Sequence, residues 1–250
     1  MKSSDSPLVD VLRLLEQCSH SDVLSIVPYL QKRFPDQWAQ ITGRKTHPLE
    51  AKWNISGDVI LDAIARSSDL TLRGIRGIIA EAVFDKSELP SVSDWESIEI
   101  AAEEAFDFQL RRKSSASITV RIQVKLQRRE RHKPKLASAS LLGKLKNPPS
   151  PMFVVEVQKT RTGKSRQGDN TRPYKFGDFD ILAVNMHPST ENWQDFRYTI
   201  GAWLLPRQED PDLIQIMQPV AALPDEHWTA SLSECLGWYE EGASKTLYQS

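Results

Sequence analysis

The sequence predicts an α/β protein in which a mixed central β-sheet is flanked by helices and preceded by a helical N-terminal region. Three observations predict this class. Apolar residues recur at helical spacing through the first third of the chain. From Phe106 onwards, apolar and polar residues alternate strictly, as they do in a half-buried strand. Two short apolar runs, 153–158 and 179–184, then have the character of buried strands.

The N-terminal region contains several predicted helices. Apolar residues at helical spacing mark 8–15 and 23–30, and a further short helix is predicted around Trp38 and Ile41. Two more helices are predicted at 54–67 and 68–83, the second of them capped by Ser68 or Asp69. We expect residues 1–67 to form a helical N-terminal region and 68–250 to form the core with a C-terminal extension.

A β-hairpin follows and gives the clearest pattern in the chain. In 106–110, the aromatic and aliphatic residues alternate with Asp107 and Gln109; residues 111–117 are turn-like, and 118–126 alternate again. Because side chains alternate between the two faces of a strand, Asp107, Gln123 and Lys125 fall on the face opposite the aliphatic residues. We expect that face to be open for chemistry.

The remainder of the chain completes the α/β pattern. A helix at 135–145 and the strand 153–158 predict a right-handed parallel crossover from the hairpin. After a polar loop at 160–175 and the strand 179–184, we expect a strand or helix at 197–205 and a strand at 213–220. A terminal helix carries Trp228, Leu232, Trp238 and Tyr239.

The charge is strongly segregated along the chain. Residues 111–175 hold 18 Lys or Arg against three acids, a balance of +15, so the rest of a chain of net charge −1 carries −16. A block of this kind can neutralise phosphates and release their counterions, which predicts contact with nucleic acid. A solvated surface is the alternative.

Several classes of protein are not indicated. No apolar run approaches the ~20 residues that cross a bilayer, and acids interrupt the start of the chain where a signal peptide is apolar. We therefore expect a cytoplasmic protein without a membrane partner. Cys18 and Cys235 are far apart, and the five His residues show no metal-ligand spacing, so neither a thiolate zinc site nor a disulfide framework is predicted.

The hairpin residues have the chemistry that phosphodiester hydrolysis needs. A divalent metal held by carboxylates neutralises developing charge, and a nearby Lys steadies the phosphate or helps to activate a water. Asp107 and Lys125 supply this minimum on neighbouring strands. The alternative for this pair is a surface ion pair, worth less than ~1 kcal/mol.

These residues resemble the signature of the PD-(D/E)xK superfamily of restriction-endonuclease-like nucleases. In that signature an Asp on one strand precedes an acid, any residue and a Lys on the next strand, often with a Glu on an earlier helix. Asp107 matches the first acid, Gln123-Val124-Lys125 the second half, and Glu81 in GIIAEAVF the helical acid. The order helix, strand, strand, helix, strand over roughly 70–185 also matches that superfamily's core.

The resemblance implies an Mg²⁺-dependent endonuclease that cuts double-stranded DNA, most like a type II restriction enzyme of phage defence and most simply a homodimer. Asp107, Glu81 and Gln123 would bind Mg²⁺, for which Mn²⁺ is expected to substitute, and Lys125 would position or activate the water. Gln123 departs from the usual acid, although a Gln carbonyl can ligate a hard cation. The alternative is a catalytically inactive DNA-binding or regulatory protein that keeps the nuclease fold.

Two further features bear on the site. A rival register is possible in strand 153–158, where Glu156-Val157-Gln158 precedes Lys159, and Asp178 and Asp180 are possible extra ligands. Basic residues near the hairpin and in the loop 160–175 can contact phosphates or enter a groove. The residues predicted to bind DNA are Arg128, Arg129, Arg161, Lys164, Arg166 and Arg172.

Overall fold

The computed structural model describes residues 17–34, 38, 47–100, 104–145, 148–149, 151–159 and 172–247. The chain divides into two units, Met1–Leu72 and Arg73–Ser250. The predicted helix 8–15, Ile41, and most of the loop 160–175 lie outside the described residues.

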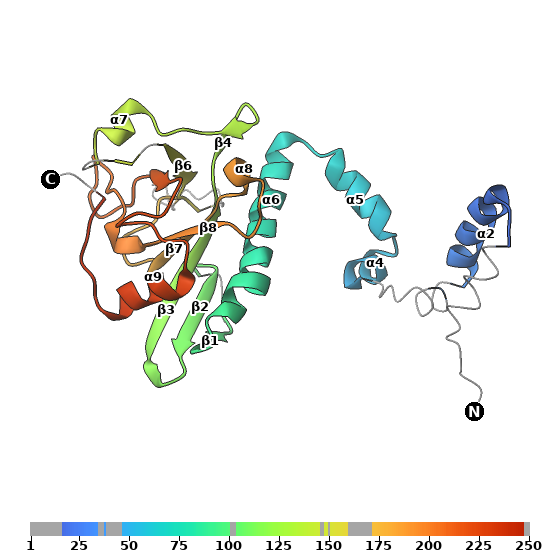
Figure 1. Ribbon diagram of the computed structural model, residues 1–250, viewed down its shortest axis with the longest axis horizontal. Helices are drawn as coiled ribbons and strands as arrows, with labels where there is room; N and C mark the ends of the chain where they lie inside the picture. The colour runs from blue at the N-terminus through green and yellow to red at the C-terminus, as the bar shows by residue number, and fades with distance from the viewer. Residues whose placement is uncertain are drawn as a thin grey trace, which may run out of the picture. The chain divides into compact units, whose positions relative to one another are not determined.

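The N-terminal unit is helical, as the sequence predicts. It contains α2 (His20–Arg33), α4 (Pro48–Trp53), α5 (Gly57–Ala65) and the start of α6 (Asp69–Val83), all drawn in blue to cyan in Figure 1. Ser19 and Asp22 form a capping box at the start of α2, and His47 and Glu50 form one at the start of α4. Neither α4 nor α5 has a buried residue.

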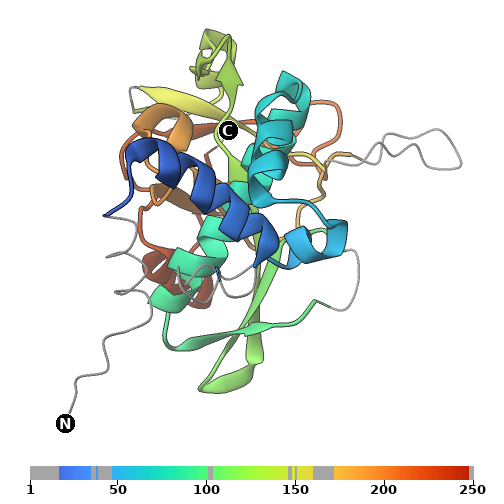
Figure 2. The same cartoon turned by 90° about the vertical axis from the view of Figure 1, so that its right-hand side faces the viewer.

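The second unit is built on a five-stranded mixed sheet, which confirms the predicted fold class. Its order is β1-β2-β3-β7-β8, and β3 and β7 are parallel whereas the other neighbours are antiparallel. The strands are β1 (Trp95–Ile98), β2 (Phe108–Arg112), β3 (Ser115–Leu126), β7 (Ile181–Asn185) and β8 (Phe196–Ile200). In Figure 2 the β2–β3 hairpin, drawn in green, extends toward the bottom of the picture.

The predicted hairpin is present, with its turn at 113–114. Phe108 pairs with Ile122, and the Asp107 N–H donates to the Ile122 carbonyl at 3.0 Å, which extends the pairing by one residue. The expectation that the polar face is open was wrong. Gln123 pairs in register with Leu182 of β7 and is only 1% exposed, because the buried cluster that contains Leu182 and Tyr174 covers this face.

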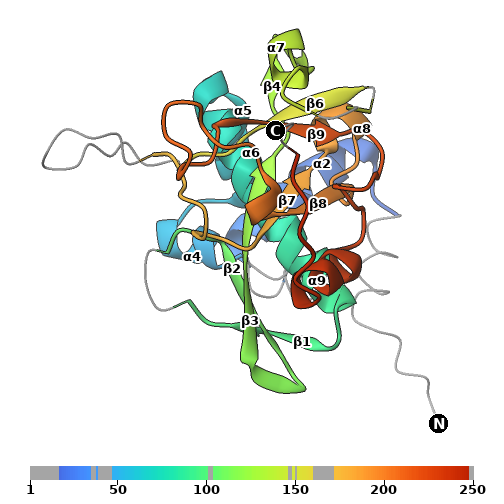
Figure 3. The ribbon, with the colours of Figure 1, turned by 90° about the vertical axis from the view of Figure 1, so that its left-hand side faces the viewer.

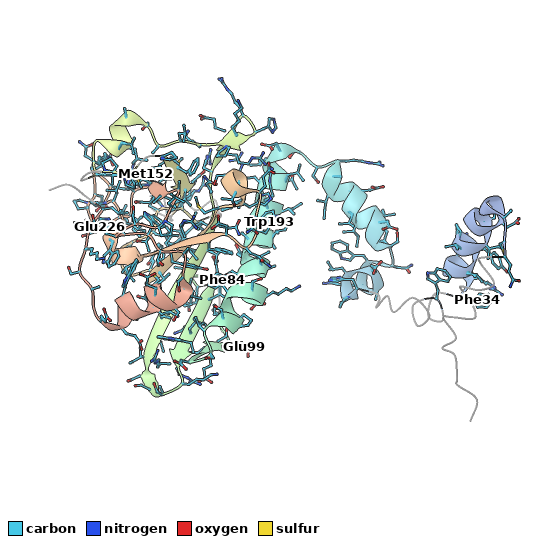
Figure 4. The ribbon with its side chains drawn as sticks, in the orientation of Figure 1. Phe34, Phe84, Glu99, Met152, Trp193 and Glu226 are labelled. Carbon is cyan, nitrogen blue, oxygen red and sulfur yellow. The ribbon has the colours of Figure 1, made fainter. Side chains whose placement is uncertain are left out.

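Helix α6 packs on the aliphatic face of β3 through the aromatic residue that follows it. Phe84, labelled in Figure 4, is fully buried with Ala80 and Ile122. Its ring centroid lies 5.0 Å from that of Phe108 and 5.8 Å from that of Phe196. Because Glu81 follows Ala80, this packing holds the C-terminal half of α6 against the start of β2.

The predicted parallel crossover from the hairpin to strand 153–158 was wrong. The segment forms β6 (Met152–Glu156), but β6 pairs with β9 (Met217–Ala221) in a separate antiparallel sheet, and the parallel partner of β3 is β7. In Figure 3 this small sheet lies at the opposite end of the unit from β1. The predicted helix 135–145 shortens to α7 (Ala139–Leu142), because Leu136 and Ala137 bond to β6 instead.

The remaining elements are short. A π-helical turn (Phe84–Glu88) and a 3-10 turn (Leu89–Ser91) lead into β1. The others are β4 (Arg129–Glu130), β5 (Lys133–Pro134), α8 (His187–Thr190), a 3-10 turn (Gly201–Trp203) and α9 (Leu232–Glu240). Among the helices of the described segments, none has the length and apolar character needed to span a membrane.

Candidate functional site

Four residues predicted from the sequence come together at the root of the β2–β3 hairpin. Glu81 is on α6, Asp107 directly precedes β2, and Gln123 and Lys125 are on β3. The hairpin register brings Asp107 beside Gln123: the Val124 N–H donates to Asp107 Oδ2 at 2.8 Å, and the Gln123 side-chain amide donates to the same oxygen. Strand β3 thus binds the Asp107 carboxylate, and Glu81 and Lys125 lie near enough to interact with it electrostatically.

The electrostatics of this site are those of two acids and one cation removed from water. Burial raises the pKa of Glu81, the neighbouring charge of Asp107 raises it further, and Lys125 opposes both effects. Burial also raises the pKa of Asp107, against the opposing influence of Lys125 and the two hydrogen bonds. Burial lowers the pKa of Lys125, whereas Asp107 and Glu81 pull it upward. The three charges therefore depend on one another.

Tyr174 and Lys159 join the site. The sequence pointed to Lys159 only as the lysine of the rival register, and it did not point to Tyr174. The Tyr174 hydroxyl donates to Gln123 Oε1 at 3.0 Å, and burial raises the pKa of Tyr174, so that it remains a hydrogen-bond donor. Lys125 Nζ lies 5.7 Å and Lys159 Nζ 5.3 Å from the centre of the Tyr174 ring. The signal available in the sequence was a lone Tyr among basic residues, which is too weak to assign a role.

The Gln123 side chain is held in a definite orientation. Its Nε2 donates to Asp107 and, at 3.1 Å, to the Val124 carbonyl, while its Oε1 accepts from Tyr174. A Gln that ligates a metal does so through its carbonyl oxygen. In this arrangement Gln123 presents its nitrogen to Asp107, so it orients the carboxylate, and ligation would require the amide to rotate.

The donors at this site fit a hard divalent cation. Glu81 and Asp107 are carboxylates, and each charge is disfavoured by burial until a cation or proton compensates it. Mg²⁺ commonly takes one or two protein carboxylates and keeps several waters. No cluster of three or more His, Cys, Asp or Glu with the geometry of a metal site occurs in the part of the chain that the structure describes. A cation here would thus be held mainly by two acids.

The other candidate acids have cationic partners. Glu156, the acid of the rival register in strand 153–158, is ion-paired with Arg128 and accepts a hydrogen bond from Gln158. It therefore has a structural role in the second sheet. Asp180 accepts from the guanidinium and backbone N–H of Arg121, with distances of 2.8 to 2.9 Å. Asp178 Oδ2 lies 3.1 Å from Lys159 Nζ.

The residues predicted to bind DNA fall into two groups. Arg128 pairs with Glu156, Arg129 donates to the His132 carbonyl at 2.7 Å, and Arg172 donates to the Lys159 carbonyl at 3.3 Å. These three therefore also have structural contacts. Arg161, Lys164 and Arg166 lie outside the described residues.

Comparisons with known proteins give one structural likeness. No protein-family model matches the chain, and the comparison with curated proteins finds no match. A solved structure entitled "The structure of a bacterial homing endonuclease: I-Ssp6803I" is similar over 70% of this chain and 97% of its own, with 17% identity and a TM-score of 0.34. A superposition this loose is no ground for transferring an activity or a ligand to this chain.

Proposed function

We propose that the protein is an Mg²⁺-dependent endonuclease of the PD-(D/E)xK superfamily that hydrolyses phosphodiester bonds in double-stranded DNA. The observation that carries the proposal is the convergence of Glu81, Asp107, Gln123 and Lys125 from one helix and two strands. The segregated positive charge of 111–175 supports a polyanionic substrate.

Each residue has a distinct part in the proposed reaction. Glu81 and Asp107 would hold Mg²⁺, which when bound would supply charge neutralisation at the phosphate and lower the pKa of water. Lys125 holds the attacking water or a phosphate oxygen, and its lowered pKa brings it closer to accepting a proton near neutrality. The water oxygen bonds to phosphorus as one P–O ester bond breaks. The attacking water releases a proton to solvent, and the leaving oxygen takes a proton from solvent. Gln123 and Tyr174 fix the direction of the Asp107 carboxylate.

The biological setting that we propose is that of a type II restriction enzyme in phage defence, acting as a homodimer. Symmetric duplex sites are matched most simply by a two-fold dimer. In this proposal residues 1–67 provide the dimer contact or part of the DNA recognition, and Mn²⁺ replaces Mg²⁺ in the site.

The catalytic proposal is tested by plasmid cleavage in Mg²⁺. We expect Asp107→Ala and Lys125→Ala each to lower the cleavage rate by at least about 100-fold, as loss of a metal ligand or a charge-stabilising group does. Lys113→Ala, in the turn at the other end of the same hairpin, is the control and should cut like the wild type. If both site variants cut at the wild-type rate, the assignment of Asp107 and Lys125 to catalysis is wrong.

A second candidate function is favoured by the orientation of Gln123. Because its amide nitrogen faces Asp107, the site could be one that has lost its metal, in a DNA-binding or regulatory protein that keeps the fold. Calorimetric titration with Mg²⁺ and Mn²⁺ separates the two candidates. DNA binding without any metal binding would establish the binder and exclude the nuclease.

A further inference from the structure

The β4–β5 hairpin is a small basic ribbon that continues directly from the strand carrying the site. Arg128 is three residues beyond Lys125, and residues 128–135 contain five Lys or Arg and one acid. At about 3.3 Å per residue, the root of the hairpin lies roughly 10 Å along the chain from Lys125. In Figure 1 the hairpin projects at one end of the second unit, next to the label β4.

The root of this hairpin is firmly anchored. The Arg128 N–H donates to the Val154 carbonyl at 2.8 Å, and the Val154 N–H donates to the Lys135 carbonyl at 3.0 Å, so both arms are tied to β6. Glu130, the single acid, pairs with Lys135 at 2.9 Å, and α8 packs against β5. The ribbon therefore extends from the sheets as a fixed element.

The tip of the hairpin has an unusual backbone. Glu130 pairs with Lys133, which leaves Arg131 and His132 as a two-residue turn, and their φ angles are +48° and +65°. Positive φ at both central residues is the requirement of a type I′ turn, where Asn-Gly is strongly preferred and side chains such as these are disfavoured. The chain nevertheless places an Arg and a His there.

The tip side chains are also exposed and free of acids. Arg131, His132 and Lys133 are exposed, and within the described residues neither Arg131 nor Lys133 forms an ion pair. Arg129 is used differently, because its guanidinium donates to the His132 carbonyl and thereby braces the turn. Arg129 thus stabilises the tip, whereas Arg131 and Lys133 form no ion pair with a described carboxylate, although the charge of Arg131 contributes to the lowered pKa of Glu130.

We propose that this hairpin enters the major groove of duplex DNA and that Arg131 and His132 contact base edges there. The inference rests on the proposed function for the choice of DNA as substrate. A B-DNA major groove is wide enough for a two-stranded β-ribbon, and Arg can donate two hydrogen bonds to guanine. The major groove of A-form RNA is too deep and narrow for such a ribbon. Arg131 is six residues beyond Lys125, at most roughly 20 Å along the chain, so the contacted bases would lie within about that distance of the scissile phosphate.

The test uses a variant that removes the side chains but favours the turn. Arg131→Asn with His132→Gly creates the most favourable I′ sequence, so the hairpin keeps its shape and the melting temperature should be unchanged or raised. Lys113→Asn is the matched control, since it removes one positive charge from the turn at the opposite end of β3. All proteins are full length.

Binding is measured without cleavage, by selection from a labelled pool of randomised DNA duplexes in metal-free buffer, followed by fluorescence anisotropy. We expect wild type and Lys113→Asn to enrich the same bases, and the tip variant to lose the preference at one or two positions and bind the selected duplex about 10-fold more weakly. An unchanged preference in the tip variant would overturn the proposal. So would an equal loss on all sequences, which indicates phosphate contact alone, or tighter binding of an RNA duplex of the same sequence.

The outcomes separate this inference from the proposed function. If the wild type selects DNA but never cleaves it, the proposed nuclease activity is excluded and the hairpin proposal is retained. If the wild type cleaves DNA and the tip variant has the same sequence preference, the nuclease activity is supported and the hairpin proposal is excluded. A wild type that binds no duplex removes the hairpin proposal outright.

Discussion

The carboxylates of Glu81 and Asp107 are held in a state that costs the metal-free protein stability. Both lie in surroundings that disfavour their charge, and each lies within the field of the other and of Lys125. Sites with such shifted pKa values occur where a bound ion or a reaction step compensates the charge. Removing one of the acids should therefore raise the stability of the metal-free protein while it weakens metal binding.

Glu81→Gln should stabilise the metal-free protein at neutral and alkaline pH. Because burial and Asp107 raise the folded-state pKa of Glu81 above its ordinary value of 4.5, ionisation costs stability as the pH rises past that value and through the folded-state pKa. Below pH 4.5 the carboxyl is protonated in both states and the variant gains nothing. We expect a melting temperature at pH 8 that is higher than that of the wild type by about 1–2 °C, a small shift because solvent screens the half-exposed carboxylate.

The same melts repeated with Mg²⁺ provide the second comparison. Mg²⁺ should raise the melting temperature of the wild type but leave that of Glu81→Gln almost unchanged, since a ligand stabilises only a protein that binds it. A variant that melts below the wild type at pH 8 without metal would contradict the expectation.

Gln123→Glu should have the opposite effect. A third buried carboxylate beside Asp107 replaces the donating amide with a like charge, so the metal-free protein should lose about 1–3 kcal/mol in a urea titration at pH 8. Addition of Mg²⁺ should restore more stability to this variant than to the wild type, because the new acid also attracts the cation. Gln123→Met, which removes the hydrogen bonds without adding charge, is the control and should show no extra response to Mg²⁺.

At the scale of elements, α6 and β3 position the site through the buried ring of Phe84. The ring packs on Phe108 and Phe196 three residues after Glu81, so the placement of the helical acid depends on this contact. Phe84→Ala should cost about 3–5 kcal/mol of unfolding free energy in urea. It should also weaken Mg²⁺ binding in calorimetry, whereas the exposed neighbour Lys86→Ala should change neither beyond about 0.5 kcal/mol.

The elements also show what the sequence could predict. The alternation across 106–126 predicted the hairpin and the approach of Asp107 to Gln123, because the period of a strand is a local property. The apolar run 153–158 correctly predicted a strand but not the sheet to which it belongs, since a buried strand has the same apolar sequence pattern in the large sheet and in the small one. Strand β1 was missed because it has only four residues, and Tyr174 because it reaches Gln123 across 51 residues of sequence.

At the scale of the whole molecule, exposed apolar residues are concentrated in the N-terminal unit. Trp53 is 57% exposed, Leu61 64% and Leu70 71%, and α4 and α5 have no buried residue. Exposed apolar residues gathered on neighbouring helices are typical of interaction surfaces. The sequence predicted helices here, but a dimer contact depends on a second chain and was an inference from the two-fold symmetry of duplex sites.

We expect Leu61→Glu to weaken the proposed homodimer. A charge is costly to bury in an apolar contact, so the dimer dissociation constant should rise at least about 10-fold. In sedimentation velocity, the apparent mass should shift from that of a dimer toward that of a monomer. Asp62→Asn, at the next position on α5, is the control. A protein that sediments as a monomer in the wild type would remove the homodimer from the proposed function and leave the site unaffected.

The Tyr174–Gln123–Asp107 hydrogen-bond chain also has a genetic consequence. Glutamine and glutamate codons differ in their first base alone, so a single transversion in this gene would install the carboxylate that the amide replaces. Random mutagenesis of the gene would sample that change readily. A library screened for DNA damage in its host would then report whether the neutral amide restrains an activity that one nucleotide can release.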